Sequence, residues 1–318
     1  MLVMTSRSHR DRLAPLQLPS HTLRGDELRI RTRAIGVNPV DWKMREGGPL
    51  HLAYRFIGPG SPFVAGIDFA GEVVEVGPAG GTIAGGTRVV GGTNFSRKQR
   101  GSYADEVIAR PDQVVELPAS VSYEAAACLP VAAVTPWIGL TEHRRRGAGP
   151  LARVLVLGAS GGVGLFGLQL ARMLGAKAFG VCSARNVAVV ERLGATAIDY
   201  GKGDPLEAAR AHGPFDVILH AVGTATYPLG KCRALLAPKG HVDLIVVRPA
   251  DVLSIAFLPS VKTVLGAPTR ARLLPLVDAL ATGKLEAIIE ERFPLLEAER
   301  AHEKSRAGKV VGKLLLTP

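Results

Sequence analysis

The stretch Val154-Leu-Val-Leu-Gly158-Ala-Ser-Gly161-Gly162-Val-Gly164-Leu-Phe-Gly167 places a glycine-rich turn between an apolar run and a helical run. The unbroken apolar run 154–157 is typical of a strand that is buried on both faces. After the turn, apolar residues recur at spacings of three and four, as on one face of a helix: Val163, Phe166, Leu170 and Leu174. Glycines let a backbone approach a pyrophosphate, and a helix N-terminus supplies N–H donors. The stretch therefore predicts a dinucleotide site.

The same alternation of apolar strands and helical runs continues towards residue 261. Further strands are expected at 178–182, 216–220 and 241–247, and a helix at 187–193. Alternating strands and helices with continuous apolar strands indicate a doubly wound parallel sheet. This part of the chain is predicted to be an α/β domain.

The preceding residues 25–118 have a different pattern, with short strands separated by glycine and proline. Residues 27–33 alternate charged or polar with apolar side chains, and Gly71-Glu-Val-Val-Glu-Val-Gly77 is a strand-like run closed by glycine. Such a series predicts a barrel-like β domain. The tail predicts a helix at 273–281 and then a further α+β segment.

Length and composition restrict the class of protein. The 318 residues suggest two domains, and 47% hydrophobic residues exclude general disorder. The net charge of +11 is scattered and aromatic residues are only 5%, so we expect no nucleic-acid partner. Three separated cysteines favour a reducing compartment, and we expect a cytoplasmic protein. Neither long uncharged stretch suits a spanning helix, so no membrane partner is expected.

The residues after the second strand of the α/β domain favour one form of the cofactor. NAD sites usually carry an acidic residue about 20 positions past the glycines, where it binds the ribose 2′-hydroxyl. Here the sequence is Ser183-Ala-Arg185-Asn186 and contains no acid. A hydroxyl and an arginine suit a 2′-phosphate, which predicts NADPH. The alternatives are a helix N-cap for Ser183 and an ordinary surface charge for Arg185.

A second motif points to another dehydrogenase class. Tyr227-Pro-Leu-Gly-Lys231 spells the YxxxK of short-chain reductases, whose tyrosine and lysine lie one turn apart on a long helix. Pro228 suits only the start of a helix, so we interpret this match as chance.

Taken together, these motifs resemble the medium-chain dehydrogenase/reductase superfamily, in its zinc-free quinone oxidoreductase branch. The matching segments run in family order from about residue 25 to the end, while residues 1–24 match poorly. The segments are Ala34–Lys43, Gly66–Val73, Gly101–Val107, Leu129–Thr135, Gly158–Gly164, Asp216–Gly223 and Gly308–Pro318.

The resemblance implies a GroES-like β-barrel catalytic domain, at 1–118 and 262–318, with a Rossmann NADPH-binding domain inserted at 119–261. It implies cofactor contacts from the glycine turn, from the ends of later strands and from one threonine. These residues are Thr135, Gly158, Ser160, Gly161, Gly162, Val163, Gly164, Ser183, Arg185, Tyr200, Lys202, Val222, Gly223 and Leu244.

The resemblance also predicts that the protein binds no metal. Zinc-dependent relatives place a cysteine ligand where Asn38 stands and a histidine in the segment that here reads Gly66-Ile-Asp68. Without a Lewis acid, hydride transfer to a conjugated acceptor is favoured. Asn38, Asp41, Lys43 and Tyr54 are the candidate catalytic residues. Asp41 is equally well explained as a structural cap. Some quinone reductases carry a tyrosine where Lys43 stands, so Tyr54 in the same loop is a substitute proton donor and solvent is the alternative.

The predicted function is an NADPH-dependent reductase of a quinone or an α,β-unsaturated carbonyl. The alternatives are an enoyl-thioester reductase of a biosynthetic pathway, and a family member without redox activity, either a lyase or cyclase or an RNA-binding protein. Relatives often pair the edges of their Rossmann sheets, so a homodimer is expected. His220 stands where relatives usually carry aspartate, and we interpret it as a histidine satisfied by a neighbouring backbone group.

Overall fold

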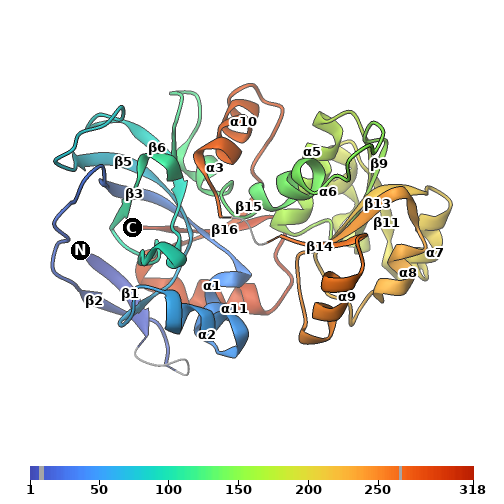
Figure 1. Ribbon diagram of the computed structural model, residues 1–318, viewed down its shortest axis with the longest axis horizontal. Coiled ribbons are helices and arrows are strands. Elements are labelled where there is room, and N and C mark those ends of the chain that lie inside the picture. The colour runs from blue at the N-terminus through green and yellow to red at the C-terminus, as the bar shows by residue number, and fades with distance from the viewer. Residues whose placement is uncertain (7–10, 265–266) are drawn as a thin grey trace. The chain divides into compact units, whose positions relative to one another are not determined.

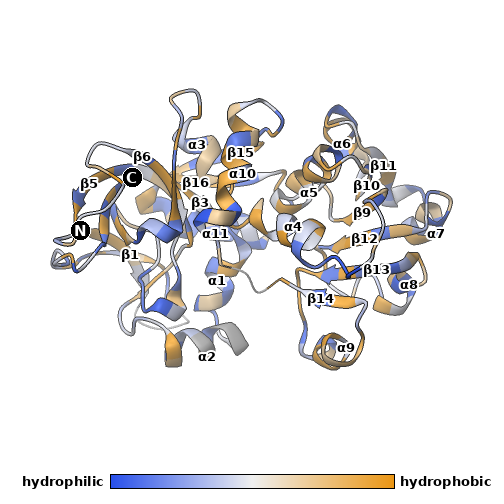
Figure 2. Cartoon of the chain, turned by 45° about the horizontal axis from the view of Figure 1, so that its top comes forward, coloured by the Kyte–Doolittle hydropathy of each residue, from blue (hydrophilic) through white to orange (hydrophobic). Residues whose placement is uncertain are grey.

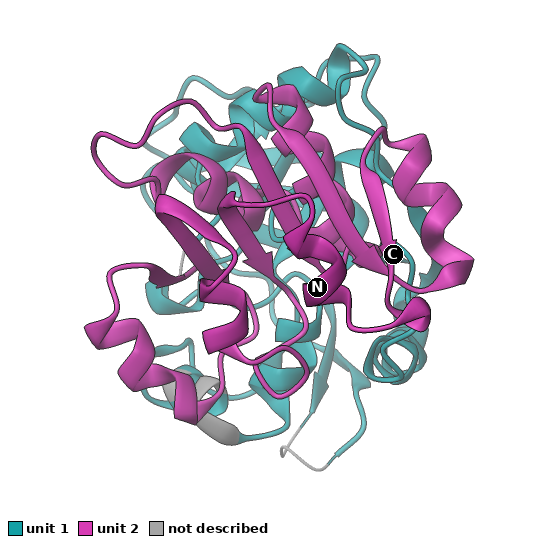
Figure 3. Ribbon diagram, turned by 90° about the vertical axis from the view of Figure 1, so that its right-hand side faces the viewer, with its two compact units in different colours: residues 1–131, 267–318 teal, residues 132–266 magenta. Residues whose placement is uncertain are grey.

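The computed structural model describes residues 1–6, 11–264 and 267–318. The chain divides into two compact units (Figure 3). Unit 1 comprises Met1–Val131 and Ala267–Pro318, and unit 2 comprises Ala132–Gly266. The first unit is therefore discontinuous in sequence, and the second interrupts it.

Unit 2 is built on one six-stranded sheet in which every neighbouring pair of strands is parallel (Figure 1). The strand order is β11-β10-β9-β12-β13-β14. The strands are β9 Arg153–Leu157, β10 Lys177–Cys182, β11 Thr196–Asp199, β12 Phe215–His220, β13 Leu236–Leu244 and β14 Val261–Thr263. This is the doubly wound parallel sheet that the sequence predicts, and the α/β fold class is confirmed.

In unit 2 a helix lies between each strand and the next, as crossovers between parallel strands require, while one α-helix and the π-helical turn that continues it precede the first strand. The α-helices are α4 Val134–Trp137, α5 Gly162–Met173, α6 Val187–Arg192, α7 Pro205–Arg210, α8 Leu229–Arg233 and α9 Val252–Phe257. A π-helical turn, η3 Ile138–Glu142, continues α4, and short 3₁₀ turns occur at η4 Ala184–Asn186, η5 Tyr200–Lys202 and η6 Pro249–Asp251.

The apolar strands explain why this sheet is central to its unit. Leu155, Leu157, Phe179, Ile218 and Val242 are buried together in one hydrophobic cluster. Each fully buried side chain of this kind contributes about 1.5–3 kcal/mol relative to an exposed position. The sheet therefore provides a rigid platform for the loops at its edge.

Unit 1 contains a seven-stranded sheet and a smaller three-stranded sheet. The larger has the order β15-β16-β3-β5-β6-β8, with β7 paired to β3, and the smaller has the order β2-β1-β4. The strands are β1 Leu2–Ser6, β2 Ala14–Gln17, β3 Leu28–Val37, β4 Phe63–Val64, β5 Asp68–Val76, β6 Arg88–Gly92, β7 Glu106–Ala109, β8 Val114–Glu116, β15 Ile289–Pro294 and β16 Lys313–Thr317. The predicted β domain is thus completed by the last residues of the chain, because β16 pairs with β3.

Helices also occur in unit 1, two of them inside the region expected to be mostly strand. They are α1 Pro39–Arg45, α2 Gly48–Ile57, α3 Tyr123–Ala127, α10 Arg270–Ala281 and α11 Ala298–Arg306, with 3₁₀ turns η1 Phe95–Arg97, η2 Pro111–Gln113 and η7 Leu295–Glu297. Helix α1 begins at Asn38 as N-cap with Pro39 in its first turn, and the Asp41 carboxylate accepts the Asn38 backbone N–H at 2.7 Å. The N-cap, the proline and this hydrogen bond together explain why a helix begins at this point.

Both hydrophobic and hydrophilic residues occur along the helices and strands of each unit (Figure 2). Among the described residues, no helix has the length and apolar character to cross a bilayer.

Candidate functional site

The glycine turn lies between β9 and α5, as expected, and each glycine has a distinct role. Gly158 adopts φ +86°, where an L side chain is strained, and a Cβ there would lie 2.9 Å from Val222 Cγ2. A Cβ on buried Gly164 would lie 2.3 Å from the Gly158 carbonyl oxygen. The turn is therefore closed on its protein side by contacts that only glycine permits.

The outer side of the same turn is open. A Cβ on Gly161 would meet only the Gly158 oxygen, at 3.7 Å. Gly161 is the N-cap of α5, and Ser160, Gly162 and Val163 are half-buried beside it. The first N–H groups of the twelve-residue helix α5 have no intrahelical acceptors. Open backbone donors at a helix N-terminus fit a pyrophosphate.

The other predicted cofactor residues on β10 and β11 follow the carboxyl ends of these neighbouring strands. Cys182 and Asp199, the last residues of the two strands, stand opposite each other in the parallel register. Ser183 follows β10 as the N-cap of η4, but its side chain makes no cap bond. Arg185 lies in η4, and the exposed residues Tyr200 and Lys202 lie in η5. These residues are brought to the sheet edge that carries the glycine turn.

The carboxyl end of β12 lies at the point where the strand order reverses. Successive strands run from β9 to β11 on one side of the sheet and from β12 to β14 on the other. Doubly wound sheets bind ligands at such a switch point. Val222 and Gly223 follow β12 here, and Leu244 ends the neighbouring strand β13 opposite His220.

His220 is buried and satisfied by its own loop, as the sequence interpretation held. Its Nδ1 accepts the Gly223 N–H at 3.3 Å, and its Nε2 lies 2.9 Å from the Tyr227 carbonyl oxygen. Nε2 therefore carries the proton and donates to Tyr227. Burial lowers the pKa of the imidazole, which keeps it neutral. The ring fixes the turn that carries Val222 and Gly223.

Thr135 belongs to α4, which packs beside α5. A Cβ on Gly167 of α5 would lie 3.5 Å from the Pro136 Cβ, so the two helices approach closely next to this threonine. Thr135 itself is half-buried.

In unit 1, Asn38 and Asp41 belong to a buried polar cluster at the start of α1. The Asn38 amide Nδ2 donates to Asp68 Oδ2 at 2.9 Å. The Lys313 ammonium donates to Asn38 Oδ1 at 2.5 Å, to Asp68 Oδ2 at 3.2 Å and to the Val37 carbonyl at 3.1 Å. Three side chains from β16, β5 and the β3–α1 junction thus share one set of hydrogen bonds.

Tyr103 and His302 extend the cluster through Asp41. The Tyr103 hydroxyl donates to Asp41 Oδ2 at 3.1 Å and lies 3.0 Å from His302 Nε2. Burial lowers the pKa of His302 to about 3, so its ring is neutral. Its Nδ1 and the second oxygen of Asp41 are buried without a hydrogen-bond partner among the described residues.

The charges in this cluster are unequal, because one ammonium faces two buried carboxylates. Burial and the neighbouring Asp68 raise the pKa of Asp41 to about 7. Burial also raises the pKa of Asp68, and Lys313 opposes that shift. The Asp41 carboxyl is accordingly partly protonated at neutral pH, and it gains or loses its proton within the physiological pH range.

Lys43 and Tyr54 stand apart from Asn38 and Asp41. In the described part of the chain no hydrogen bond joins either side chain to them. Lys43 Nζ lies 5.5 Å from the centre of the Trp42 ring, and burial lowers the pKa of this ammonium. Tyr54 is buried in α2, and burial raises the pKa of its hydroxyl to about 12. Of the four predicted catalytic side chains, only Lys43 is not buried.

The cluster around Lys313 does not fit a zinc ion. Zinc needs thiolate, imidazole or carboxylate ligands, and here the Asp68 carboxylate already contacts an ammonium. The described residues include no group of three or more histidine, cysteine or acidic side chains arranged to hold a metal.

Sequence reasoning missed the partners in this cluster. Tyr103 and Lys313 lay within segments used for the resemblance, but neither was given a role there, and His302 was not considered. The available signal was the lysine placed directly before Leu314-Leu-Leu, since a charge at the head of a buried strand needs a partner.

The short-chain reductase motif does not form its usual pair. Pro228 is the N-cap of α8, so Tyr227 precedes the helix and only Lys231 lies within it. Lys231 is exposed and pairs with Asp204 at 3.1 Å.

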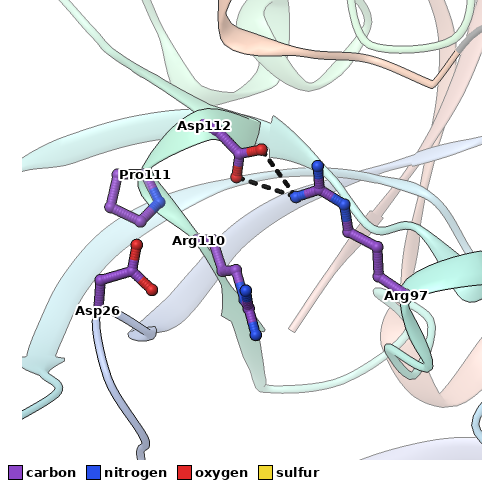
Figure 4. A pocket seen from close by; sticks show the side chains of 5 residues that line it. All are labelled: Asp26, Arg97, Arg110, Pro111 and Asp112. Atoms are coloured by element: carbon purple, nitrogen blue, oxygen red, sulfur yellow. Dashed lines mark hydrogen bonds and ion pairs between the residues drawn. The ribbon is translucent and has the colours of Figure 1, made fainter.

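A surface hollow of about 630 Å³ in unit 1 is lined by other residues (Figure 4). Its walls are Asp26, Arg97, Arg110, Pro111 and Asp112. Arg97 and Asp112 pair across it at 2.7 Å. None of the predicted site residues lines this hollow.

Two family models match the chain. The alcohol dehydrogenase GroES-like domain matches residues 24–119, and the zinc-binding dehydrogenase model matches residues 193–316. The first corresponds to the predicted β domain.

Relatives and solved structures match over nearly the whole chain. The chloroplast envelope quinone oxidoreductase homolog of Arabidopsis thaliana is 30% identical over 317 residues, covering 96% of this chain and 94% of the relative. The trans-enoyl reductase pgmF of Aspergillus terreus is 30% identical over 324 residues, covering 95% and 89%. The quinone oxidoreductase of Coxiella burnetii has a TM-score of 0.86 at 27% identity, covering 100% and 98%. The resemblance is confirmed: the chain belongs to the medium-chain dehydrogenase/reductase superfamily of pyridine-nucleotide-dependent oxidoreductases, in its quinone oxidoreductase-like branch.

Proposed function

We propose that the protein is a zinc-independent reductase that uses NADPH to reduce a conjugated acceptor, either a quinone or an α,β-unsaturated carbonyl. The observation that carries this proposal is the gathering of the glycine turn, Ser183 and Arg185 at the carboxyl edge of one parallel sheet. The names of the relatives support the acceptor class, since they include quinone oxidoreductases and trans-enoyl reductases.

The preference for NADPH over NADH rests on the residues that follow β10. Arg185 supplies a guanidinium for a 2′-phosphate, and Ser183 supplies a hydroxyl that makes no helix-cap bond. The nearest acid at this edge, Asp199, accepts the Gly201 N–H at 2.9 Å and so caps η5. Tyr200 and Lys202 complete the proposed phosphate side.

Zinc independence is supported by the chemistry of the Asn38 cluster. The Lys313 ammonium binds Asp68 Oδ2 and Asn38 Oδ1, and the one other carboxyl of the cluster, Asp41, cannot supply the ligand set that zinc needs. We expect activity to persist after prolonged treatment with a chelator, as measured by NADPH oxidation. Loss of turnover that added zinc restores would contradict this part of the proposal.

The bound nicotinamide supplies a hydride to the acceptor. The anion formed is delocalised over the conjugated system and then takes up a proton. Lys43 is the proposed donor, because it is the candidate side chain that is not buried, and solvent is the alternative. Asn38 and Asp41 would position the acceptor, and Tyr54 would support the segment that lines it.

A homodimer is proposed through the edge of the unit 2 sheet. Among the described residues, strand β14 pairs with β13 alone and ends the strand order, so the other side of β14 has backbone groups without a neighbouring strand from that part of the chain. Helix α9 beside it exposes Val252, Leu253 and Phe257.

The three cysteines are free and buried, in keeping with the reducing cytoplasm that we propose as the location of the protein.

The test is NADPH oxidation, followed at 340 nm, against a panel of quinones, enones and enoyl thioesters. Turnover of quinones or simple enones supports the proposal. Preference for enoyl thioesters would favour the second candidate, an enoyl-thioester reductase, which the match to a trans-enoyl reductase supports. Tight NADPH binding without turnover of any acceptor would refute both.

A further inference from the structure

Helix α2 has an inner face that anchors it to unit 1. The buried Tyr54 ring lies 4.8 Å from the Phe63 ring and 6.0 Å from the Phe95 ring, measured between ring centres. These contacts with β4 and η1 determine which side of the helix faces the protein. The opposite side of the helix consequently faces away from unit 1.

The outer face of α2 is apolar and exposed. Leu52, Phe56 and Ile57 are 55%, 74% and 48% exposed. Leu52 and Phe56 are four residues apart, so they are neighbours on the outer face. Ile57, three residues after Tyr54, is the last residue of the helix and is exposed at its C-terminal end. Figure 2 shows α2 at the margin of unit 1. A single exposed apolar residue is ordinary, but three large ones on one short helix form a patch.

The surroundings of this patch are basic. Arg55 is exposed on α2. Lys98 and Arg100 are exposed in the segment that follows η1, and η1 itself contacts α2. Burial raises the pKa of the Tyr54 hydroxyl, and the charge of Arg100 partly opposes that rise, which places this guanidinium near the helix. Within the described ranges no ion pair ties Arg55, Lys98 or Arg100 to a carboxylate. Arg97 is the exception in this segment, since it pairs with Asp112 (Figure 4).

Acidic residues are absent from the sequence on both sides of the patch. Neither residues 47–67 nor residues 93–104 include an aspartate or glutamate. The basic residues appear scattered along the sequence, but the fold packs α2, which carries Arg55, against η1, the turn that directly precedes residues 98–100. A second copy of the same face would bring like charges together, which disfavours a symmetric contact.

We propose that the outer face of α2 docks the protein on an anionic lipid surface. Leu52, Phe56 and Ile57 enter the boundary between headgroups and acyl chains, and Arg55, Lys98 and Arg100 lie against the anionic headgroups. An amphipathic helix with large apolar residues and flanking cations binds a bilayer in this way without crossing it. A lone helix presents a ridge rather than a groove, which suits a deformable lipid surface. This differs from the expectation of no membrane partner, which rested on the absence of a spanning segment.

The experiment is sedimentation of the full chain with vesicles of phosphatidylcholine alone or with 30% phosphatidylglycerol, over a range of salt. We expect binding to the anionic vesicles that weakens as salt rises. The variant L52S/F56S/I57S should bind at least tenfold more weakly. The variant R55Q/K98Q/R100Q should lose the preference for anionic vesicles. Both are compared with L16S/L274S/L296S, which removes three exposed apolar side chains elsewhere in unit 1.

Circular dichroism and thermal unfolding establish that each variant folds. Because R55Q/K98Q/R100Q changes only exposed side chains, it tests the proposal even if the apolar variant fails to fold. Equal binding to both vesicle types would overturn the proposal, as would equal loss in the L16S/L274S/L296S variant. A change in solution mass caused by L52S/F56S/I57S would also overturn it, because the face would then cover a second copy. The test does not use turnover, so it is independent of the proposed function.

Discussion

Asp41 shows how one side chain can hold both a structural and a chemical role. Its Oδ2 accepts two hydrogen bonds, from the Asn38 backbone and from Tyr103, and so fixes the start of α1. Its second oxygen is buried without a described partner. The cap interpretation is therefore satisfied by one oxygen, while burial and the neighbouring Asp68 raise the pKa of the carboxyl to about 7.

Protonation of Asp41 should give stability a distinctive pH dependence. The folded pKa of about 7 lies above the unfolded value near 4. Its contribution is complete below the unfolded pKa and is lost as pH rises through 7. Between about pH 5 and 6.5 the folded state holds one extra proton, so the unfolding free energy falls by about 1.4 kcal/mol per pH unit. The Asp41→Asn variant should lack this slope in urea unfolding.

Asp243 in unit 2 offers a control with the opposite sign. Burial raises its pKa, but hydrogen bonds with His143 at 2.6 Å and His241 at 3.1 Å hold it below its usual value. Its contribution is present above the unfolded pKa and lost as pH falls. Asp243→Asn should therefore leave the slope between pH 5 and 6.5 unchanged. An identical effect of both variants would refute the assignment to Asp41.

Arg185 is the residue on which the choice of cofactor depends. Arg185→Ala removes a charge-assisted contact worth about 1.5–3 kcal/mol, which corresponds to roughly 10- to 100-fold in KM for NADPH. The KM for NADH should change less than about threefold, since NADH has no 2′-phosphate. Lys231→Ala removes an exposed cation of the same unit and should leave both values unchanged. Equal effects of Arg185→Ala on the two cofactors would contradict the proposal.

The sequence held more information on the glycine turn than on the buried cluster in unit 1, for a physical reason. The glycine turn is a local signal, since strand, turn and helix lie within residues 153–173. Lys313 and Asn38 are 275 residues apart and meet only because β16 pairs with β3. No local pattern records such a contact. For the same reason, Tyr103 and His302 carried no signal of their shared bond.

At the scale of elements, the β9–α5 turn contains two kinds of glycine: those that the fold requires, and one that leaves room for the proposed ligand. Gly158 and Gly164 are required by neighbouring protein atoms, whereas Gly161 faces open space. The sequence predicted this turn fully, because the glycines and the flanking periodicity agree. It did not predict α1 and α2, since Pro39 and Gly47 interrupt a region that otherwise has strand character.

Two glycine substitutions should distinguish an effect on folding from an effect on ligand binding. In Gly164→Ala the new Cβ would lie 2.3 Å from a backbone oxygen, so Tm should fall by the equivalent of about 1–3 kcal/mol. In Gly161→Ala the Cβ meets no protein atom within 3.7 Å at φ −75°, so Tm should be kept. NADPH affinity should still fall at least tenfold, because the methyl group occupies the approach to the turn. Calorimetry and fluorescence titration measure the two effects. Unchanged NADPH binding by Gly161→Ala would show that the pyrophosphate lies elsewhere.

At the scale of the molecule, an uninterrupted segment carries all the residues of the proposed phosphate side of the cofactor site. Unit 2 is continuous from Ala132 to Gly266, whereas unit 1 needs both ends of the chain, because β16 from the C-terminus pairs with β3. The predicted domain limits of 118 and 262 stay predictions, and expression of the segment tests the inserted arrangement directly.

Residues 132–266 expressed alone should fold, dimerise and bind the 2′-phosphate end of NADPH. The segment holds its own buried core, the glycine turn, Ser183 and Arg185. It also holds β14 and the apolar face of α9, on which the proposed dimer depends. We expect a cooperative thermal transition, a dimeric mass by light scattering, and affinity for 2′-phospho-ADP-ribose within about tenfold of the full chain, since 1.4 kcal/mol corresponds to one factor of ten. The double variant L253D/F257D should be monomeric with unchanged ligand affinity, because the charged side chains disrupt only the α9 face. A folded segment that binds no ligand would place essential phosphate contacts in unit 1, and a monomeric segment would remove the sheet edge as the dimer contact.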